Sequence, residues 1–216
     1  LMTTLAFLVV ALVATPEAID FTKLKWEPLT ITDGVDVSRC EVPNSAIMGV
    51  RGIATVDVHI GKIYELFRTV PRQPEWVNRL KETYVFSKPQ DDDVRYYSRY
   101  HSPWPISDRD FVFQRKLTIE EDKKRVTVNI RSVEDERMPE NDCCVRGWLT
   151  RGYWRFTAQE GGKTLIEVEV ITDPKGFLPT WLINLVQKSW PVKSIGGLVS
   201  RAAEPDIPKT PEYAEW

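Results

Sequence analysis

Apolar and polar side chains alternate with a period of two through the middle of the chain. In each alternating segment, apolar or aromatic residues hold most of every second position and polar residues lie between them; these segments are 94–100, 111–119, 126–130 and 166–170. Such alternation predicts antiparallel strands with one buried face and one face in water. Trp148, Trp154 and Phe156 share a parity that predicts a further strand, and Gly161-Gly162 is typical of a hairpin turn after it.

Two segments carry a helical period instead. Ile60, Ile63, Tyr64 and Phe67 follow the i, i+3, i+4, i+7 spacing of one helix face, which predicts a helix over 60–68. Strands are expected before it, at 26–31, at 35–42 and in a β-rich run over 48–58.

A second, longer helix is expected from Pro179 to about Ala203. Leu182, Val186 and Trp190 lie along one face, and Pro191 is expected to kink the helix because it lacks a backbone N–H. A run of strands closed by one long helix predicts an α+β fold, in which a curved antiparallel sheet grips the C-terminal helix.

The chain reads as one domain with two distinct ends. Residues 5–14 form an apolar run that is too short to span a bilayer comfortably but matches the core of a secretory signal. We therefore interpret 1–18 as a signal peptide or membrane-anchoring segment, the alternative being an apolar helix packed on the domain. The first reading predicts a periplasmic or secreted protein. The domain is expected over 19–204, followed by a Pro-rich tail over 205–216 that wraps the surface.

Charge and cysteine content exclude some functions. The 29 Lys and Arg residues nearly balance the 31 Asp and Glu residues, so no electrostatic case exists for a nucleic-acid partner. Cys143 and Cys144 are adjacent and can pair only with strained geometry, while a bridge from Cys40 to either stays open. No Cys/His cluster predicts a metal site.

Catalytic signatures are also missing from the sequence. His59 and His101 are the two histidines, and neither a Gly-rich phosphate loop nor a nucleophile–His–acid motif is present. We therefore expect a protein that is not an enzyme and that needs no cofactor.

Two polar features lie within the apolar pattern. Arg115 shares its parity with Phe111 and Phe113, which is costly for a guanidinium unless it pairs with a buried acid, turns outward, or faces the phosphate or carboxylate of a ligand. The Ser107-Asp108-Arg109-Asp110 cluster at a strand entry is expected to make local caps and ion pairs. An acid/base dyad is the less favoured alternative, because neighbouring strand residues point opposite ways.

Two motifs resemble one known family. PWPISDRDFVFQR at 103–115 is similar to a strand entry of the START (steroidogenic acute regulatory protein-related lipid transfer) domain family, and GFLPTWLIN at 176–184 is similar to the opening of that family's last helix. The early strand and helix at 50–68 and the PEW segment at 74–76 also match in order. The resemblance covers roughly 19–203 and is that of a single-domain bacterial-type member.

The resemblance implies a helix-grip fold, in which the sheet surrounds a tunnel that the C-terminal helix closes. It also implies that one lipid (a phospholipid, a sterol or a fatty-acid-like molecule) binds in the tunnel and is carried between membranes by a monomer that touches membrane surfaces transiently. Tyr96 stands where sterol-binding relatives can have an acid, so a sterol-type ion pair with Arg115 is not expected. No clear aromatic cage for a choline headgroup is found.

Two sets of residues follow from this interpretation. The residues expected to line the tunnel are Tyr96, Ser98, Tyr100, Phe111, Phe113, Arg115, Trp148, Trp154, Ile166, Val168, Leu182 and Val186. Those expected at a mobile gate are Trp104, Pro105, Ile106 and Leu178, with Pro191 and Gly196-Gly197 as flex points or, alternatively, as a kink and a site of tight packing.

Two other functions remain open on the same fold. One is an enzyme of the polyketide cyclase or hydratase kind, which requires a polar constellation inside the tunnel. The other is a lipid-sensing interaction domain, which requires a partner that binds only the loaded form.

Overall fold

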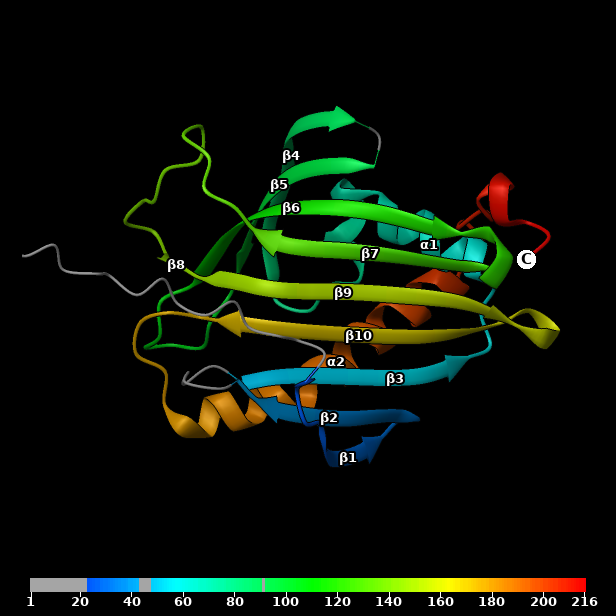
Figure 1. Cartoon of the computed structure of the whole chain (residues 1–216). Helices are drawn as coiled ribbons and strands as arrows, with labels where there is room; N and C mark the ends of the chain where they lie inside the picture. The colour runs from blue at the N-terminus through cyan, green and yellow to red at the C-terminus, as the bar shows by residue number, and fades with distance from the viewer. Residues whose placement is uncertain (1–22, 43–47, 91) are drawn as a thin grey trace, which may run out of the picture.

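A single curved sheet dominates the computed structural model of the chain, which describes residues 23–42, 48–90 and 92–216 (Figure 1). Its ten strands within that part of the chain are β1 (Glu27–Thr32), β2 (Val35–Glu41), β3 (Met48–Val56), β4 (Leu80–Gln90), β5 (Asp93–Tyr100), β6 (Arg109–Glu120), β7 (Arg125–Ser132), β8 (Val145–Arg146), β9 (Trp148–Gln159) and β10 (Lys163–Asp173). The expected segment 1–18 lies outside the described residues.

The strand order is β1-β2-β3-β10-β9-β7-β6-β5-β4, with the short β8 attached to β6. Neighbours along this path pair antiparallel, and β8 pairs parallel with β6. The sheet is open, and β3 joins β10 although more than a hundred residues separate them in the chain. An ion pair from Arg51 on β3 to Glu169 on β10, at 2.8 Å, lies across this junction.

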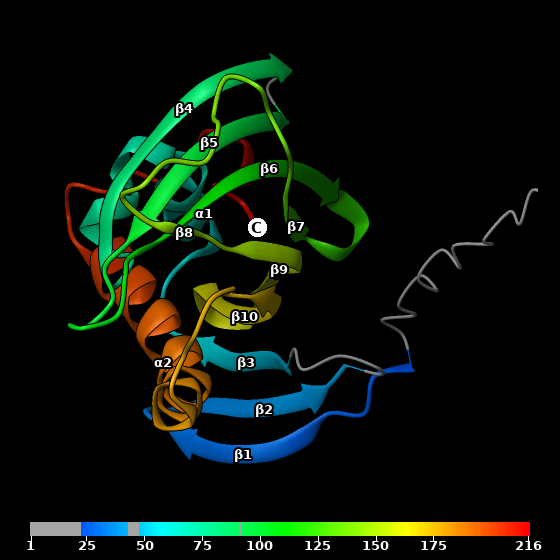
Figure 2. The ribbon, with the colours of Figure 1, turned by 90° about the vertical axis from the view of Figure 1, so that its left-hand side faces the viewer.

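Two helices lie on one face of the sheet. Figure 2 shows the sheet as an arc whose concave side holds α1 (Ile60–Arg68) and α2 (Thr180–Ala203). A 3₁₀ helix, Val70–Glu75, follows α1. The predicted α+β helix-grip fold is therefore confirmed.

The main core lies between the concave face and the helices. Phe67 of α1 and Leu198 of α2 pack there with inward side chains of β7, β9 and β10, such as Phe156 and Ile166. A Cβ atom on Gly52 of β3 would come within 2.7 Å of Pro191, so α2 packs directly on the strand at that point. The helix runs without interruption through Pro191.

The prediction that Trp148 points inward with Trp154 is wrong. The β9–β10 ladder pairs Ile171 with Arg151 but Thr172 with Leu149, so the register shifts by one residue between these pairs. Such a bulge reverses the facing of the residues beyond it. Leu149 is consequently buried, and Trp148 is 37% exposed.

The expected inward position of Val186 is also wrong, because it is 47% exposed. The buried stripe of α2 passes instead through Gln187, Pro191, Ile195 and Leu198, the positions that face the sheet.

Of the cysteine pairings left open, the structure contains the bond between Cys143 and Cys144, while Cys40 is buried and unpaired. A bridge from Cys40 is therefore excluded. No helix among the described residues is both long and apolar enough to cross a bilayer.

Candidate functional site

A cavity of about 880 Å³ opens on the concave side of the sheet. Its walls come from α1 and the connection after it, from β4 to β7, and from the C-terminal segment after α2. The volume lies within the range typical of small-molecule sites.

The cavity has an apolar wall and a charged edge. The apolar wall includes Phe67, Val70, Val94, Leu117 and Val128. Exposed groups of both signs complete the lining: Arg68, Lys88, Asp92, Glu121 and Glu212. Such a lining suits a molecule that has an apolar part and a polar end.

Arg115 lies in the wall of this cavity and is buried. Its guanidinium donates to the carbonyl oxygens of Phe67, at 3.3 Å, and Arg68, at 2.9 Å, at the end of α1. Those carbonyls carry the partial negative charge of a helix C-terminus, which a cation stabilises.

Among the described residues, no carboxylate lies within ion-pair distance of Arg115, so the expected alternative of a buried acidic partner is wrong. Burial lowers the pKa of Arg115, although a guanidinium stays protonated at any physiological pH. A buried cation without an anionic partner favours a ligand group rich in acceptors, since the five N–H donors of a guanidinium exceed the two carbonyls.

A cluster of aromatic rings continues from Arg115 toward the opposite end of β6. The rings of Tyr96 and Phe113 lie 5.2 Å apart, as do those of Phe111 and Phe113, while Tyr100 and Phe111 are 5.9 Å apart. Burial raises the pKa of Tyr96 to about 12, so its hydroxyl is neutral at physiological pH. Val70 and Val94 belong both to this cluster and to the cavity wall, and the two regions therefore adjoin.

The structure places most of the predicted lining residues on the concave side. Those that are buried there are Tyr96, Ser98, Phe113, Arg115, Trp154, Ile166, Val168 and Leu182, while Tyr100 and Phe111 are half-buried. Arg115 is the member of this set that borders the 880 Å³ cavity. Which of the others touch a ligand stays a prediction.

The Ser107–Asp110 cluster makes local ion pairs, as its sequence predicts. Asp108 accepts from Lys81 at 2.8 Å, from Arg99 at 2.8 Å and from the backbone N–H of Ser102 at 3.1 Å. Burial alone would raise the pKa of Asp108, but these hydrogen bonds outweigh it and hold the pKa well below its usual range.

Arg109 joins two loops at the same end of the sheet. Its guanidinium donates to Ser107 O at 2.6 Å, to Pro174 O at 3.2 Å and to Lys175 O at 3.0 Å. The loop between β5 and β6 is thereby held against the loop that leads into α2. Burial lowers the pKa of Arg109.

This end of the molecule exposes large apolar side chains. Trp104 in the first loop is 92% exposed and Phe177 in the second is 84% exposed. Trp181 and Leu185 in the first turns of α2 are also exposed, as is Val186. Of the other predicted gate residues, Pro105 is exposed, and Ile106 and Leu178 are half-buried. Exposed apolar patches are typical of surfaces that bind another protein, a membrane or a ligand.

Sequence reasoning missed the contribution of the C-terminal segment. Tyr213 and Trp216 line the cavity beside Tyr64, and Tyr213 is buried. The predicted helix face already included Tyr64, but the tail has no periodicity to show where it docks. The aromatic side chains of Tyr213 and Trp216 were the feature of the tail that could have predicted its contact with the cavity.

The chain is similar in sequence to a known domain family and to several known proteins. The sequence pattern of the START domain matches residues 25–204 of the chain. An uncharacterised protein of Pseudomonas aeruginosa is 27% identical over 177 residues, which cover 82% of this chain and 86% of the relative. Phosphatidylcholine transfer protein of Bos taurus is 22% identical over 169 residues, which cover 76% of this chain and 78% of that protein.

Solved structures show the same fold. Human STARD10 superposes with a TM-score of 0.74 at 19% identity, over 82% of this chain and 72% of that chain.

Proposed function

The chain belongs to the START domain family, and from that premise we propose that it binds one lipid in its concave interior and carries it between membranes. The match to phosphatidylcholine transfer protein supports lipid as the ligand class. The single observation that carries the proposal is the cavity of about 880 Å³ with its apolar wall.

The position of the ligand follows from the chemistry of the interior. The polar end lies near Arg115, whose guanidinium has donors to spare. The apolar part lies against Val70 and Val94, along the aromatic cluster that starts with Tyr96 and Phe113. Burying acyl chain is worth about 0.8 kcal/mol per methylene, so a lipid gains about as much in this interior as in a bilayer. Transfer is then limited by the opening of the protein.

The exposed apolar end provides the contact with the membrane. Trp104 and Phe177 project from two loops that Arg109 holds together. Indole and phenyl rings partition favourably to the interface between lipid and water. Insertion of these rings would bring the start of α2 to the bilayer, where its displacement opens the interior.

Lipid binding and transfer can be measured directly on the full chain. Native mass spectrometry of gently purified protein is expected to show one bound lipid per monomer. Fluorescent phospholipid and fatty acid are then offered in donor vesicles, and their transfer to acceptor vesicles is followed. Absence of bound lipid together with no acceleration of transfer for either class would contradict the proposal.

Removing the exposed rings tests the membrane contact. The double variant Trp104→Ser with Phe177→Ser is expected to slow transfer at least fivefold and to leave the thermal midpoint unchanged, because both side chains lie in water. Ile31→Ser is the matched control, since Ile31 is 76% exposed on β1, an edge strand of the sheet. Equal slowing by the control would mean that general surface apolarity, and not this end, governs transfer.

A further inference from the structure

The segment that follows α2 docks back onto α1. The family match ends at residue 204, so residues 205–216, here termed the strap, are an addition to the matched domain. Ile207, Thr210 and Tyr213 of the strap are buried. The sequence predicted a tail that wraps the surface, whereas these residues anchor it in the core.

One turn of α1 holds the middle of the strap, while Asp206 at its start accepts from Arg201 of α2 at 2.7 Å. The backbone N–H of Thr210 donates to Gly61 O at 3.0 Å, and the Thr210 hydroxyl lies 3.1 Å from both Gly61 O and a carboxylate oxygen of Glu65. Tyr213 packs edge-on against Tyr64 with the ring centroids 5.1 Å apart. Beyond Thr210, the strap is held by ring contacts and by hydrogen bonds from the His59 side chain to the backbone of Ala214 and Trp216.

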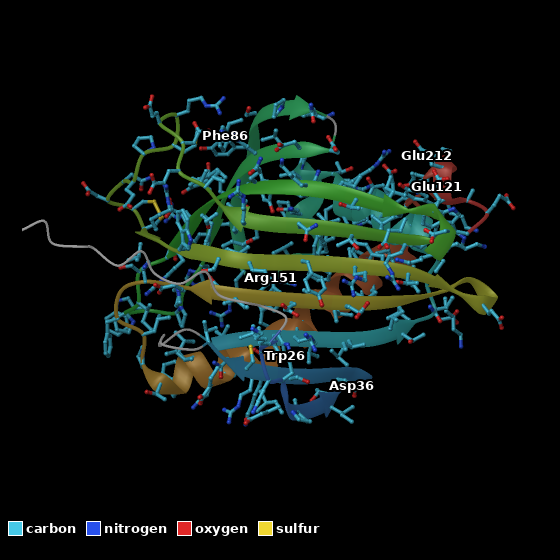
Figure 3. The ribbon with its side chains drawn as sticks, in the orientation of Figure 1. Trp26, Asp36, Phe86, Glu121, Arg151 and Glu212 are labelled. Atoms are coloured by element: carbon cyan, nitrogen blue, oxygen red, sulfur yellow. A yellow bond between two sulfur atoms is a disulfide. The ribbon has the colours of Figure 1, made fainter. Side chains whose placement is uncertain are left out.

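The residues of the strap beyond Thr210 form part of the cavity wall. Glu212, Tyr213 and Trp216 border the same cavity as Arg115 and Leu117. Figure 3 shows Glu212 beside Glu121 at the end of the molecule where β6 finishes, and both residues border the cavity. The loops that carry Trp104 and Phe177 lie at the other end of the sheet (Figure 1).

We propose that the strap is a hinged closure over a mouth at the charged edge of the cavity, through which the polar end of the bound amphiphile enters and leaves. This inference rests on the proposed function and deepens it. The mouth has the chemistry for that task, since the exposed Arg68, Asp92 and Glu121 provide charges of both signs around an apolar wall. Opening of the strap from Thr210 onward requires the loss of the contacts that Thr210, Tyr213 and Trp216 make around α1 while the sheet stays intact, which makes it a local event.

A reversible tether tests whether the strap must move. A Cβ atom on Gly61 would lie 3.3 Å from the Cβ of Lys209, within a few tenths of an ångström of the separation in a disulfide. The variant Gly61→Cys with Lys209→Cys is therefore expected to form a bridge on oxidation. Oxidised protein should release bound lipid to acceptor vesicles at least fivefold more slowly than the same variant after reduction. The native chain, carried through the same redox steps, controls for Cys143 and Cys144.

A second variant loosens the strap instead. Thr210→Val removes the buried hydroxyl and is expected to speed lipid release about threefold to tenfold. Thr164→Val is the matched control, because Thr164 is also buried and donates to a backbone carbonyl, that of Val58 at 2.7 Å, but lies on β10. Faster release in the first variant alone supports the closure, whereas equal release rates in both overturn it.

Hydrogen exchange decides the question without a ligand. The amides of the strap, including that of Thr210, are expected to exchange at least a hundredfold faster than the amides of β9. Exchange of both sets at one common rate would overturn the proposal, as would unchanged release from the oxidised tether. If no lipid binds at all, the proposed function fails while the exchange result still reports whether the strap opens.

Discussion

At the scale of single residues, Arg115 combines two opposed energies. Its desolvation costs several kcal/mol, while its hydrogen bonds to the carbonyls of Phe67 and Arg68 return about 1.5–3 kcal/mol each. Replacement by the apolar methionine, Arg115→Met, is therefore expected to change the free energy of unfolding by less than about 1.5 kcal/mol. Affinity for a lipid with an anionic or acceptor-rich polar end is expected to fall at least tenfold.

Urea unfolding and lipid titration measure the two effects of Arg115→Met separately. Lys116→Met is the control, because the neighbouring side chain points to the exposed face of the same strand. A large loss of stability with unchanged affinity would show that Arg115 serves the end of α1 alone.

Asp108 predicts a dependence of stability on pH. Its pKa is depressed in the folded protein, so its stabilising effect is complete above the unfolded value of about 4 and declines as the pH falls below it. Asp108→Asn is expected to cost about 1–3 kcal/mol at pH 7, and the difference from the native chain should shrink steadily below pH 4. Urea unfolding at pH 7, 4 and 3 measures this, and a difference that is constant over the range would refute the assignment.

How far single side chains could be predicted depended on whether their strand was regular. The inward parity of Tyr96, Phe113 and Arg115 follows from the period of two and is confirmed by their contacts, since Tyr96 packs on Phe113 and Arg115 donates to the end of α1. The prediction for Trp148 was wrong because a bulge lies between it and Trp154. A bulge depends on how two strands pair, and the pattern of one strand does not show that. The carbonyl partners of Arg115 were likewise unpredictable, because they belong to a helix that is distant in the sequence.

At the scale of elements, adjacent glycines of α2 have different roles. A Cβ atom on Gly197 would lie 2.3 Å from the carbonyl oxygen of Trp76, whereas one on Gly196 would meet nothing within 4 Å. Of the two readings of this pair, tight packing therefore holds for Gly197. The helix can approach the 3₁₀ segment below it only because this position lacks a side chain.

Alanine substitution should separate these glycines. Gly196→Ala is expected to raise the free energy of unfolding by about 0.5–1 kcal/mol, since alanine is the better helix former. Gly197→Ala is expected to lower it by about 1–3 kcal/mol, because the backbone of Trp76 must move. Thermal or urea unfolding measures both, and changes of the same sign would contradict the packing.

The elements themselves were largely readable from the sequence. Alternation over 111–119 and 166–170 gave strands, and the spacing of Ile60, Ile63 and Phe67 gave α1. The docking of the strap was not readable, because residues 205–216 have no repeating pattern and are held by isolated anchors such as Thr210.

At the scale of the whole molecule, the pairing of strands predicts an order of folding. The strands from β4 to β7 pair with sequence neighbours, whereas β3 must find β10, with Arg51 and Glu169 lying 118 residues apart. Local pairs close small loops and form early, while distant pairs cost more chain entropy. We expect the transition state to contain the local pairs and to lack the junction of β3 with β10.

Two matched truncations of buried valines test this order. Val126→Ala on β7 is expected mainly to slow folding, and Val50→Ala on β3, where that strand pairs with β10, mainly to speed unfolding. Stopped-flow folding and unfolding rates in urea measure both effects. Faster unfolding of the β7 variant together with slower folding of the other variant would contradict the proposed order.

The same junction has a consequence for synthesis of the protein. Since β10 is translated long after β3, the first three strands emerge from the ribosome without the neighbour that completes their hydrogen bonding. Until then the outer edge of β3 is free to pair with other nascent chains. Among the described strands, β3 is thus the one whose edge waits longest for its partner before the sheet is complete.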